Sequence, residues 1–312
     1  MPEMFEEVKA SIDELWGRDS SDWHDIVVFD TLQNAIIRIT NRIFVGAELH
    51  RNKDYVEYAR SFVESLPFQA MMIRLFVPTL LKPMFGPILA LPCRYYIWRC
   101  SRYLLPVIRQ KVGEAEQSAK RAVVQDVDGA NVLQLIARLA VKSSDAVDSD
   151  TYSICSRLLS LNFVGIHTST FTIVNTIYDI MGSGSSEEVL GTLRREAEES
   201  LRQSNNVWTK SAVNRLTHID SAIRESLRIS GFKAKGLERH VIAANGVTLP
   251  DGTHLPKDTR VGAPTSEIHF DERFYPDPTR YDAFRYCRGK TNLAMVNTSD
   301  IFLAFGHGRH AW

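Results

Sequence analysis

The chain has 312 residues, enough for one large α-rich domain or for about two smaller domains. Apolar residues make up 44% of the sequence and charged residues 24%, as in folded globular proteins rather than disordered or fibrous ones. Lysine plus arginine equals aspartate plus glutamate at 37 each, without long runs of one sign. This balance argues against nucleic-acid binding, which normally requires a basic excess or a basic stripe.

The first nine residues are acidic and amphipathic and do not have the pattern of a signal peptide. No stretch reaches the roughly 18 uninterrupted apolar residues that a membrane span needs. The nearest candidate, Phe76 to Trp98, is interrupted by Lys82, Arg94 and four prolines, which exclude a regular spanning helix. We expect this stretch to be either a buried loop or a surface that enters a membrane interface.

In chain order, apolar residues at helical spacing predict eight helices, near residues 3–16, 31–44, 52–66, 98–119, 130–141, 150–182, 185–203 and 211–229. Ser185 or Ser186 can cap the seventh helix, with Glu187 and Glu188 in its first turn. Turn sequences then separate short β-type pieces over residues 238–261, and a proline-rich irregular segment follows over 272–288. The predicted fold is mainly α with a small β-sheet.

The four cysteines, Cys93, Cys100, Cys155 and Cys287, have neither zinc-module nor disulfide-framework spacing. They are most simply interpreted as buried or incidental thiols in a reducing compartment.

Two patterns late in the chain are unspecific when each is taken alone. Glu225 and Arg228 stand at i and i+3 on one predicted helix face, a spacing usually found in solvated surface salt bridges. The segment from Tyr275 to Arg285 is by itself a proline-punctuated loop.

Two further patterns carry polar groups into glycine-containing segments. Gly165, His167, Thr168 and Ser169 interrupt the apolar helix over 150–182, so this notch faces a cavity or its hydroxyls bond back to their own helix. The glycine-rich turn of residues 302–312, with adjacent cations, could bind an anion through backbone amides.

Together and in this order, the four patterns resemble a fungal haem-thiolate monooxygenase of the cytochrome P-450 family over essentially the whole chain. Glu225 and Arg228 match the glutamate–arginine pair of that family's K helix. Arg280 matches the meander arginine that completes its buried structural triad. The resemblance therefore implies an incomplete cytochrome P-450 fold, with residues 1–312 forming a single partial domain.

The resemblance also implies site residues. Thr168 takes the place of the proton-relay threonine in the oxygen-activation motif, and His167 replaces the usual acidic residue there. His167 either takes part in the proton relay or only fills a polar gap in the helix. Arg239 stands where the family offers an arginine to a haem propionate.

The family's partners follow from the same resemblance. It implies haem as cofactor, an apolar small-molecule substrate, and electrons from an NADPH-cytochrome reductase, in fungal specialised metabolism. It also implies attachment to the endoplasmic-reticulum membrane, with residues 76–98 at the membrane surface. Because this chain contains no anchor segment, we expect it to be cytoplasmic or peripheral as written.

The resemblance fails at both ends. Phe305, Gly308 and His310 match the haem-binding turn, but Trp312 stands at the position of the cysteine ligand. An indole nitrogen can only donate and cannot replace the thiolate that anchors the iron. The family's anchor and first strands have no counterpart before Met1. Either the sequence is an incomplete copy of a working monooxygenase, or the chain is a non-catalytic remnant that binds a small molecule or a partner.

Overall fold

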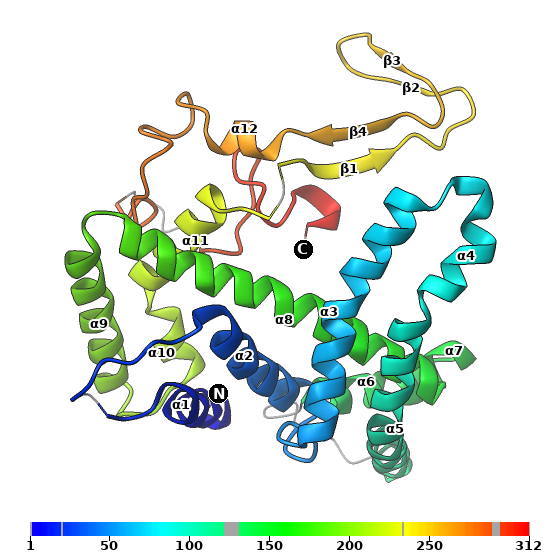
Figure 1. The fold of residues 1–312 in the computed structure, drawn as a ribbon, viewed down its shortest axis with the longest axis horizontal. Coiled ribbons are helices and arrows are strands. Elements are labelled where there is room, and N and C mark those ends of the chain that lie inside the picture. The colour runs from blue at the N-terminus through cyan, green and yellow to red at the C-terminus, as the bar shows by residue number, and fades with distance from the viewer. Residues whose placement is uncertain (1, 20, 122–130, 233, 289–293, 312) are drawn as a thin grey trace. The chain divides into compact units, whose positions relative to one another are not determined.

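The computed structural model describes residues 2–19, 21–121, 131–232, 234–288 and 294–311. The chain divides into two compact units, Met1–Phe171 and Thr172–Trp312, each of which is described here by itself (Figure 1). Helix α8 (Thr151–Gly182) belongs to both, since the division falls within it. As predicted, the fold is mainly helical with a small amount of strand.

The regular elements in the described residues of the first unit are all helices, joined by loops. Besides the first part of α8, its elements are α1 (Pro2–Trp16), α2 (Val28–Phe44), α3 (Lys53–Phe76), η1 (Thr79–Leu81), α4 (Lys82–Leu89), α5 (Leu91–Lys120), α6 (Val132–Lys142) and α7 (Ala146–Ser149). Helix α3 packs against α5, and η1 and α4 connect the two at one end (Figure 1).

The prolines of the 76–98 stretch do not produce the buried loop that was one expectation. Pro83 and Pro92 lie in the first turns of α4 and α5, where a missing amide hydrogen costs nothing. Before this stretch, Pro67 lies in the interior of α3, which nevertheless continues ten residues beyond its predicted end and packs along α5. Among the described residues, no helix combines the length and apolarity needed to cross a membrane.

The core of the first unit lies between α3, α5, α6 and α8. Leu104, Ile108, Leu133, Ile154 and Leu158 are all fully buried there. One polar cluster is embedded in it. The Tyr55 hydroxyl donates to Asn41 Oδ1 at 3.1 Å, and Asn162 Nδ2 donates to the same oxygen at 3.2 Å. These three side chains join α2, α3 and α8 without any charge, and burial raises the pKa of Tyr55.

The second unit contains shorter elements. After the end of α8 come α9 (Ser186–Arg202), α10 (Lys210–Asn214), α11 (Thr217–Ile229), β1 (Gly236–His240), β2 (Val247–Thr248), β3 (His254–Leu255), β4 (Arg260–Ala263), α12 (Thr265–His269) and η2 (Gly308–His310). Ser185 occupies the predicted N-cap position of α9, but its side chain accepts no hydrogen bond from the amides of the first turn. The Ser185 hydroxyl lies 3.4 Å from the Ser183 hydroxyl instead.

The single helix predicted over 211–229 is two helices, α10 and α11. The break is explained by Glu196 of α9, whose carboxylate accepts hydrogen bonds from the backbone amides of His218 and Ile219 at 2.8 and 3.0 Å. This carboxylate caps a new helix start at Thr217. It comes from a different helix, so local sequence did not reveal it.

The strands form two antiparallel pairs, β1 with β4 and β2 with β3. In the first pair Arg239 stands opposite Val261, and the register shifts between Gly236 and Arg239. Gly246 precedes β2 with φ +71°, and a side chain there would lie 2.4 Å from the Leu255 carbonyl oxygen. The predicted Asn245-Gly246 turn therefore requires its glycine.

Candidate functional site

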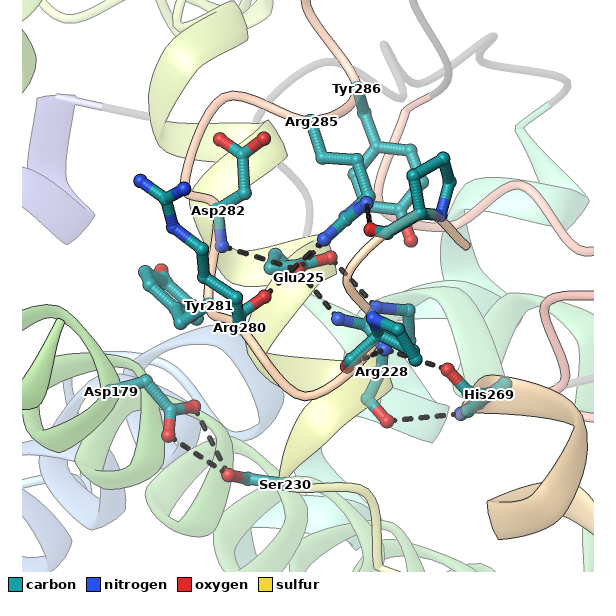
Figure 2. Close-up of polar contacts among 12 residues, drawn as sticks. Asp179, Glu225, Arg228, Ser230, His269, Arg280, Tyr281, Asp282, Arg285 and Tyr286 are labelled. Atoms are coloured by element: carbon teal, nitrogen blue, oxygen red, sulfur yellow. Dashed lines mark hydrogen bonds and ion pairs between the residues drawn. The ribbon is translucent and has the colours of Figure 1, made fainter. Parts of the chain in front are cut away.

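Helix α11 places Glu225 and Arg228 on one face, and both side chains are completely buried. Arg228 Nε lies 2.9 Å from Glu225 Oε2, and Arg228 Nη2 lies 2.7 Å from Oε1, which makes the pair bidentate (Figure 2). The solvated surface pair that this spacing usually indicates is thereby excluded.

The remaining donor of Arg228 reaches beyond its helix. Its Nη1 donates to the carbonyl oxygens of His269 and Pro278, at 2.6 and 2.8 Å. One guanidinium thus holds α11, the end of α12 and the irregular segment of residues 270–288 together. A buried charge with this many partners is satisfied, and removing either member of the pair would leave the other uncompensated.

The third member of the cluster is Arg285, and the prediction of Arg280 is wrong. Arg285 Nε donates to Glu225 Oε1 at 3.0 Å, and the Arg285 side chain is 14% exposed. Arg280 is exposed, and Figure 2 shows its guanidinium directed away from Glu225. Only the Arg280 backbone takes part, since its carbonyl oxygen accepts from Arg285 Nη2 at 3.3 Å.

A turn explains this exchange of roles. Asp277 has φ +50°, and the Arg280 amide donates to the Asp277 carbonyl oxygen at 3.0 Å, so the chain reverses there with Arg280 on its outer side. A second turn follows, in which the amide of Asp282 donates to Glu225 Oε1 at 3.3 Å. Arg285 therefore returns to α11, five residues after the arginine that motif matching selected.

Residues that the sequence did not single out complete this cluster. The Tyr281 hydroxyl donates to the Ala222 carbonyl oxygen at 3.0 Å, and the Tyr286 amide donates to Ser221 Oγ at 3.1 Å. Asp179 of α8 accepts from Ser230 Oγ, and burial raises the pKa of Asp179 (Figure 2). The Arg-Tyr dipeptide recurs at 280–281 and 285–286, a weak signal that could have pointed to the two tyrosines.

His269 is a further buried residue that sequence reasoning missed. Its Nε2 accepts a hydrogen bond from the Leu303 amide at 2.9 Å, so the ring proton lies on Nδ1, which donates to the Arg228 carbonyl oxygen at 3.2 Å. Burial, followed by the nearby positive charge, lowers the pKa of His269 to about 4. The imidazole is therefore neutral near pH 7.

In the central helix, His167 and Thr168 are both bonded to backbone. His167 Nε2 lies 3.0 Å from the Val63 carbonyl oxygen of α3, which makes Nε2 the protonated nitrogen. Thr168 Oγ1 donates to the Val164 carbonyl oxygen at 2.6 Å, one turn back in α8. Both contacts agree with the structural alternatives considered for this notch, and the catalytic roles of the two residues stay predictions.

The predicted cofactor-binding residues all belong to the second unit. Arg239 of β1 is exposed, and its Nη1 donates to the Glu238 carbonyl oxygen at 2.9 Å. Phe305 is half-buried in a turn in which Gly306 and Gly308 have φ +74° and +79°, values that favour glycine. The His310 side chain and Trp312 lie outside the described part of the chain.

None of the four described cysteines lies in the C-terminal turn of residues 302–311, where the resemblance places the thiolate ligand. Burial raises the pKa of all four thiols, to about 12 for Cys100 and Cys155, which disfavours the thiolate form that a metal ligand takes. Cys287 is half-buried and its Sγ donates to the Thr217 carbonyl oxygen. Among the residues that the structure describes, no group of three or more histidine, cysteine, aspartate or glutamate side chains could hold a metal ion.

Comparison with known proteins gives a consistent result. The cytochrome P-450 family model matches residues 1–311. The chain is 33% identical to the cytochrome P-450 monooxygenase gloP of Glarea lozoyensis, covering 98% of this chain and 59% of that protein. It is 32% identical to the monooxygenase htyF of Aspergillus rugulosus, covering 99% of this chain and 47% of that protein.

Among solved structures, the retinoic acid-bound cyanobacterial protein CYP120A1 matches with a TM-score of 0.64 and 18% identity, over 100% of this chain and 62% of that one. That match concerns the fold alone. The chain spans about half to three fifths of the length of the two fungal relatives. The match of the family model over nearly every residue shows that the chain belongs to the cytochrome P-450 family.

Proposed function

We propose that this chain is part of a fungal cytochrome P-450 monooxygenase that oxidises an apolar small molecule in specialised metabolism. The observation that carries the proposal is the buried cluster of Glu225, Arg228 and Arg285, which joins α11 to the segment that leads toward the C-terminal turn. Its bidentate pair and its lack of exposure support a framework of this family rather than an incidental surface pair.

Haem, the cofactor implied by the family, would supply the oxidising chemistry. We propose Arg239 as a propionate partner because it is an exposed guanidinium whose one described hydrogen bond is local. We propose that the turn around Phe305 and Gly308, with His310, packs on the cofactor. Electrons would come from an NADPH-cytochrome reductase, as the resemblance implies.

Thr168 and His167 are the proposed residues for proton delivery. The Thr168 hydroxyl is held at the Val164 carbonyl oxygen, and rotation of its side chain would release it toward a bound ligand. His167 keeps its proton on Nε2, so its Nδ1 is the nitrogen able to accept one.

One observation favours the second candidate function, a non-catalytic remnant that binds a small molecule or a partner chain. Trp312 stands at the ligand position, and the four described cysteines lie outside the turn of residues 302–311. A chain of this kind would retain the family's fold without thiolate-ligated iron.

The test is an optical spectrum of the purified 312-residue chain and of its Trp312→Cys variant, each mixed with haem, reduced and exposed to carbon monoxide. The proposal predicts the red-shifted Soret band of thiolate-ligated ferrous–CO haem in the variant and not in the unchanged chain. A band in both, lost on Cys287→Ser, would overturn the assignment of position 312. A band in neither would favour the remnant.

We also propose peripheral contact with a membrane surface through α4 and its neighbours. Exposed apolar side chains gather there, and Phe76, Leu80, Met84, Ile88 and Leu91 are 55–90% exposed. Residues 65–113 contain no aspartate or glutamate, while Arg74 and Arg94 are exposed. This combination suits insertion between anionic headgroups.

Sedimentation with phosphatidylcholine vesicles, with and without phosphatidylserine, tests the membrane contact. Leu80→Asp should lower vesicle binding at least about tenfold, since a charge would enter the apolar layer. Leu139→Asp is the matched control, because Leu139 is a 67% exposed leucine on α6. Equal losses in both variants would contradict the proposed contact.

A further inference from the structure

Helix α11 carries two further buried or half-buried polar side chains, Asp220 and Arg224, that the Glu225–Arg228 cluster does not explain. Asp220, Arg224 and Arg228 follow one another at intervals of four residues, which places Asp220 and Arg224 in a row with the cluster's Arg228 on one face of the helix. Arg224 is only 2% exposed. Asp220 and Arg224 contact residues 294–302, in the segment that leads into the C-terminal turn.

Arg224 forms the centre of the row. Its Nη1 donates to the carbonyl oxygens of Ala294 and Asn297, at 2.6 and 2.7 Å. The guanidinium also lies 3.7 Å from the centre of the Phe302 ring and 4.7 Å from that of Tyr286. One planar group therefore fixes both the beginning and the end of residues 294–302.

The two ends of the row hold the same segment. Asp220 Oδ2 accepts from the Met295 amide at 2.6 Å, and burial raises the pKa of Asp220. At the other end, the Arg228 carbonyl oxygen accepts from His269 Nδ1 (Figure 2). The other ring nitrogen of His269, Nε2, accepts from the Leu303 amide. The His269 ring also stacks on Phe302, with 5.5 Å between ring centres.

We propose that Asp220, Arg224 and His269 are positioning residues that set the place of the Phe302–Ala311 turn against α11. The importance of that turn for a cofactor rests on the proposed function, whereas the anchoring itself does not. Arg224 acts here through neutral carbonyl groups and an aromatic face. Its side chain is thus a hydrogen-bonding fork rather than half of an ion pair.

Arg224→Met and Arg224→Lys separate positioning from packing. Both replacements have long unbranched side chains, but only lysine can still donate to the Ala294 and Asn297 carbonyl oxygens. In hydrogen exchange of the 312-residue chain, followed by mass spectrometry, Arg224→Met should speed exchange of the 294–303 amides at least about tenfold. Exchange in α9 should change much less, and Arg224→Lys should restore part of the protection.

Asp220→Ala provides a second, milder variant if Arg224→Met does not fold. It should speed exchange around Met295, whereas Asp220→Asn, which keeps an acceptor oxygen, should stay close to the unchanged chain. Arg195→Gln is the control, because Arg195 is an exposed arginine of α9 whose guanidinium donates to Thr192 Oγ1 on the same helix.

Two results would overturn the inference: equal protection in the methionine and lysine variants, or equal acceleration in α9 and in residues 294–303. Neither depends on haem. If the proposed function is wrong, the expected hydrogen-exchange rates of residues 294–303 stay the same. If the anchoring is wrong, the expected carbon monoxide spectrum of the Trp312→Cys variant stays the same.

Discussion

The interior of each unit is stabilised by different interactions. In the first, one apolar cluster of twenty buried residues among those described includes Tyr55, which forms a small uncharged group with Asn41 and Asn162. In the second, the described apolar cluster contains only Ile180, Val189, Ala222 and Ala283, while Arg224 and Arg228 are among the largest fully buried side chains.

This difference follows from secondary structure. Long helices satisfy their own backbone groups, so they can pack through apolar faces alone. Irregular segments such as 270–288 and 294–303 present carbonyl and amide groups that need partners elsewhere. Buried arginines of α11 supply those partners, so hydrogen bonds from guanidinium groups organise these segments of the second unit.

The largest expected effect is on the Glu225–Arg228 pair. Arg228→Met should lower the free energy of unfolding of the second unit by about 3–5 kcal/mol, because it leaves Glu225 buried with only Arg285 as a charged partner. Urea denaturation, followed by circular dichroism and by hydrogen exchange in α11, measures this loss. A loss below about 1 kcal/mol would break the contrast between the units.

A core substitution in α8 tests the apolar side of the comparison. Leu158 is fully buried, so Leu158→Ala should cost about 3 kcal/mol through lost burial and a residual cavity. Leu161→Ala, on the same helix at 38% exposure, should cost less than about 1 kcal/mol. In Leu158→Ala, amide hydrogen exchange should become faster only within residues 28–171. Equally faster exchange in α11 would contradict the idea that the two units are stabilised separately.

The pH dependence of the second unit comes next. Because burial lowers the pKa of His269 to about 4, below its ordinary 6.5, the folded state binds fewer protons than the unfolded state between these values. His269 therefore contributes stability above about pH 6.5, and this contribution is lost as the pH falls toward 4. The loss should amount to about 3 kcal/mol.

The matched variant is His269→Gln, which cannot titrate. The difference in unfolding free energy between the two proteins, measured by urea denaturation from pH 7 to pH 4, isolates His269 from other groups. Glu225, Arg224 and Arg228 influence the His269 ring, but all three remain in both proteins. Parallel pH curves for the two proteins would show that His269 is not buried as described.

Some features of the fold and site could be predicted from the sequence because they depend on local spacing. The pairing of Glu225 with Arg228 followed from an i, i+3 interval, whereas its burial followed only from the family resemblance. The helix over 150–182 followed from its apolar length. Most of the other helices followed from periodicity in the same way.

The features that were missed depend on distant partners. The break before α11 is set by Glu196, about twenty residues earlier. The choice of Arg285 over Arg280 depends on a reversal at Asp277, whose positive φ the sequence did not signal. His269 was missed because both of its hydrogen-bond partners, Arg228 and Leu303, lie more than thirty residues away.

The most direct test of the account compares Arg285→Met with Arg280→Met by urea denaturation at neutral pH. Arg285→Met should lower the unfolding free energy of the second unit by about 2 kcal/mol, because it removes a charge-assisted hydrogen bond to buried Glu225. Arg280→Met should change it by less than about 0.5 kcal/mol, as expected of an exposed side chain. The reverse order of the two losses would contradict the arrangement of charges around α11.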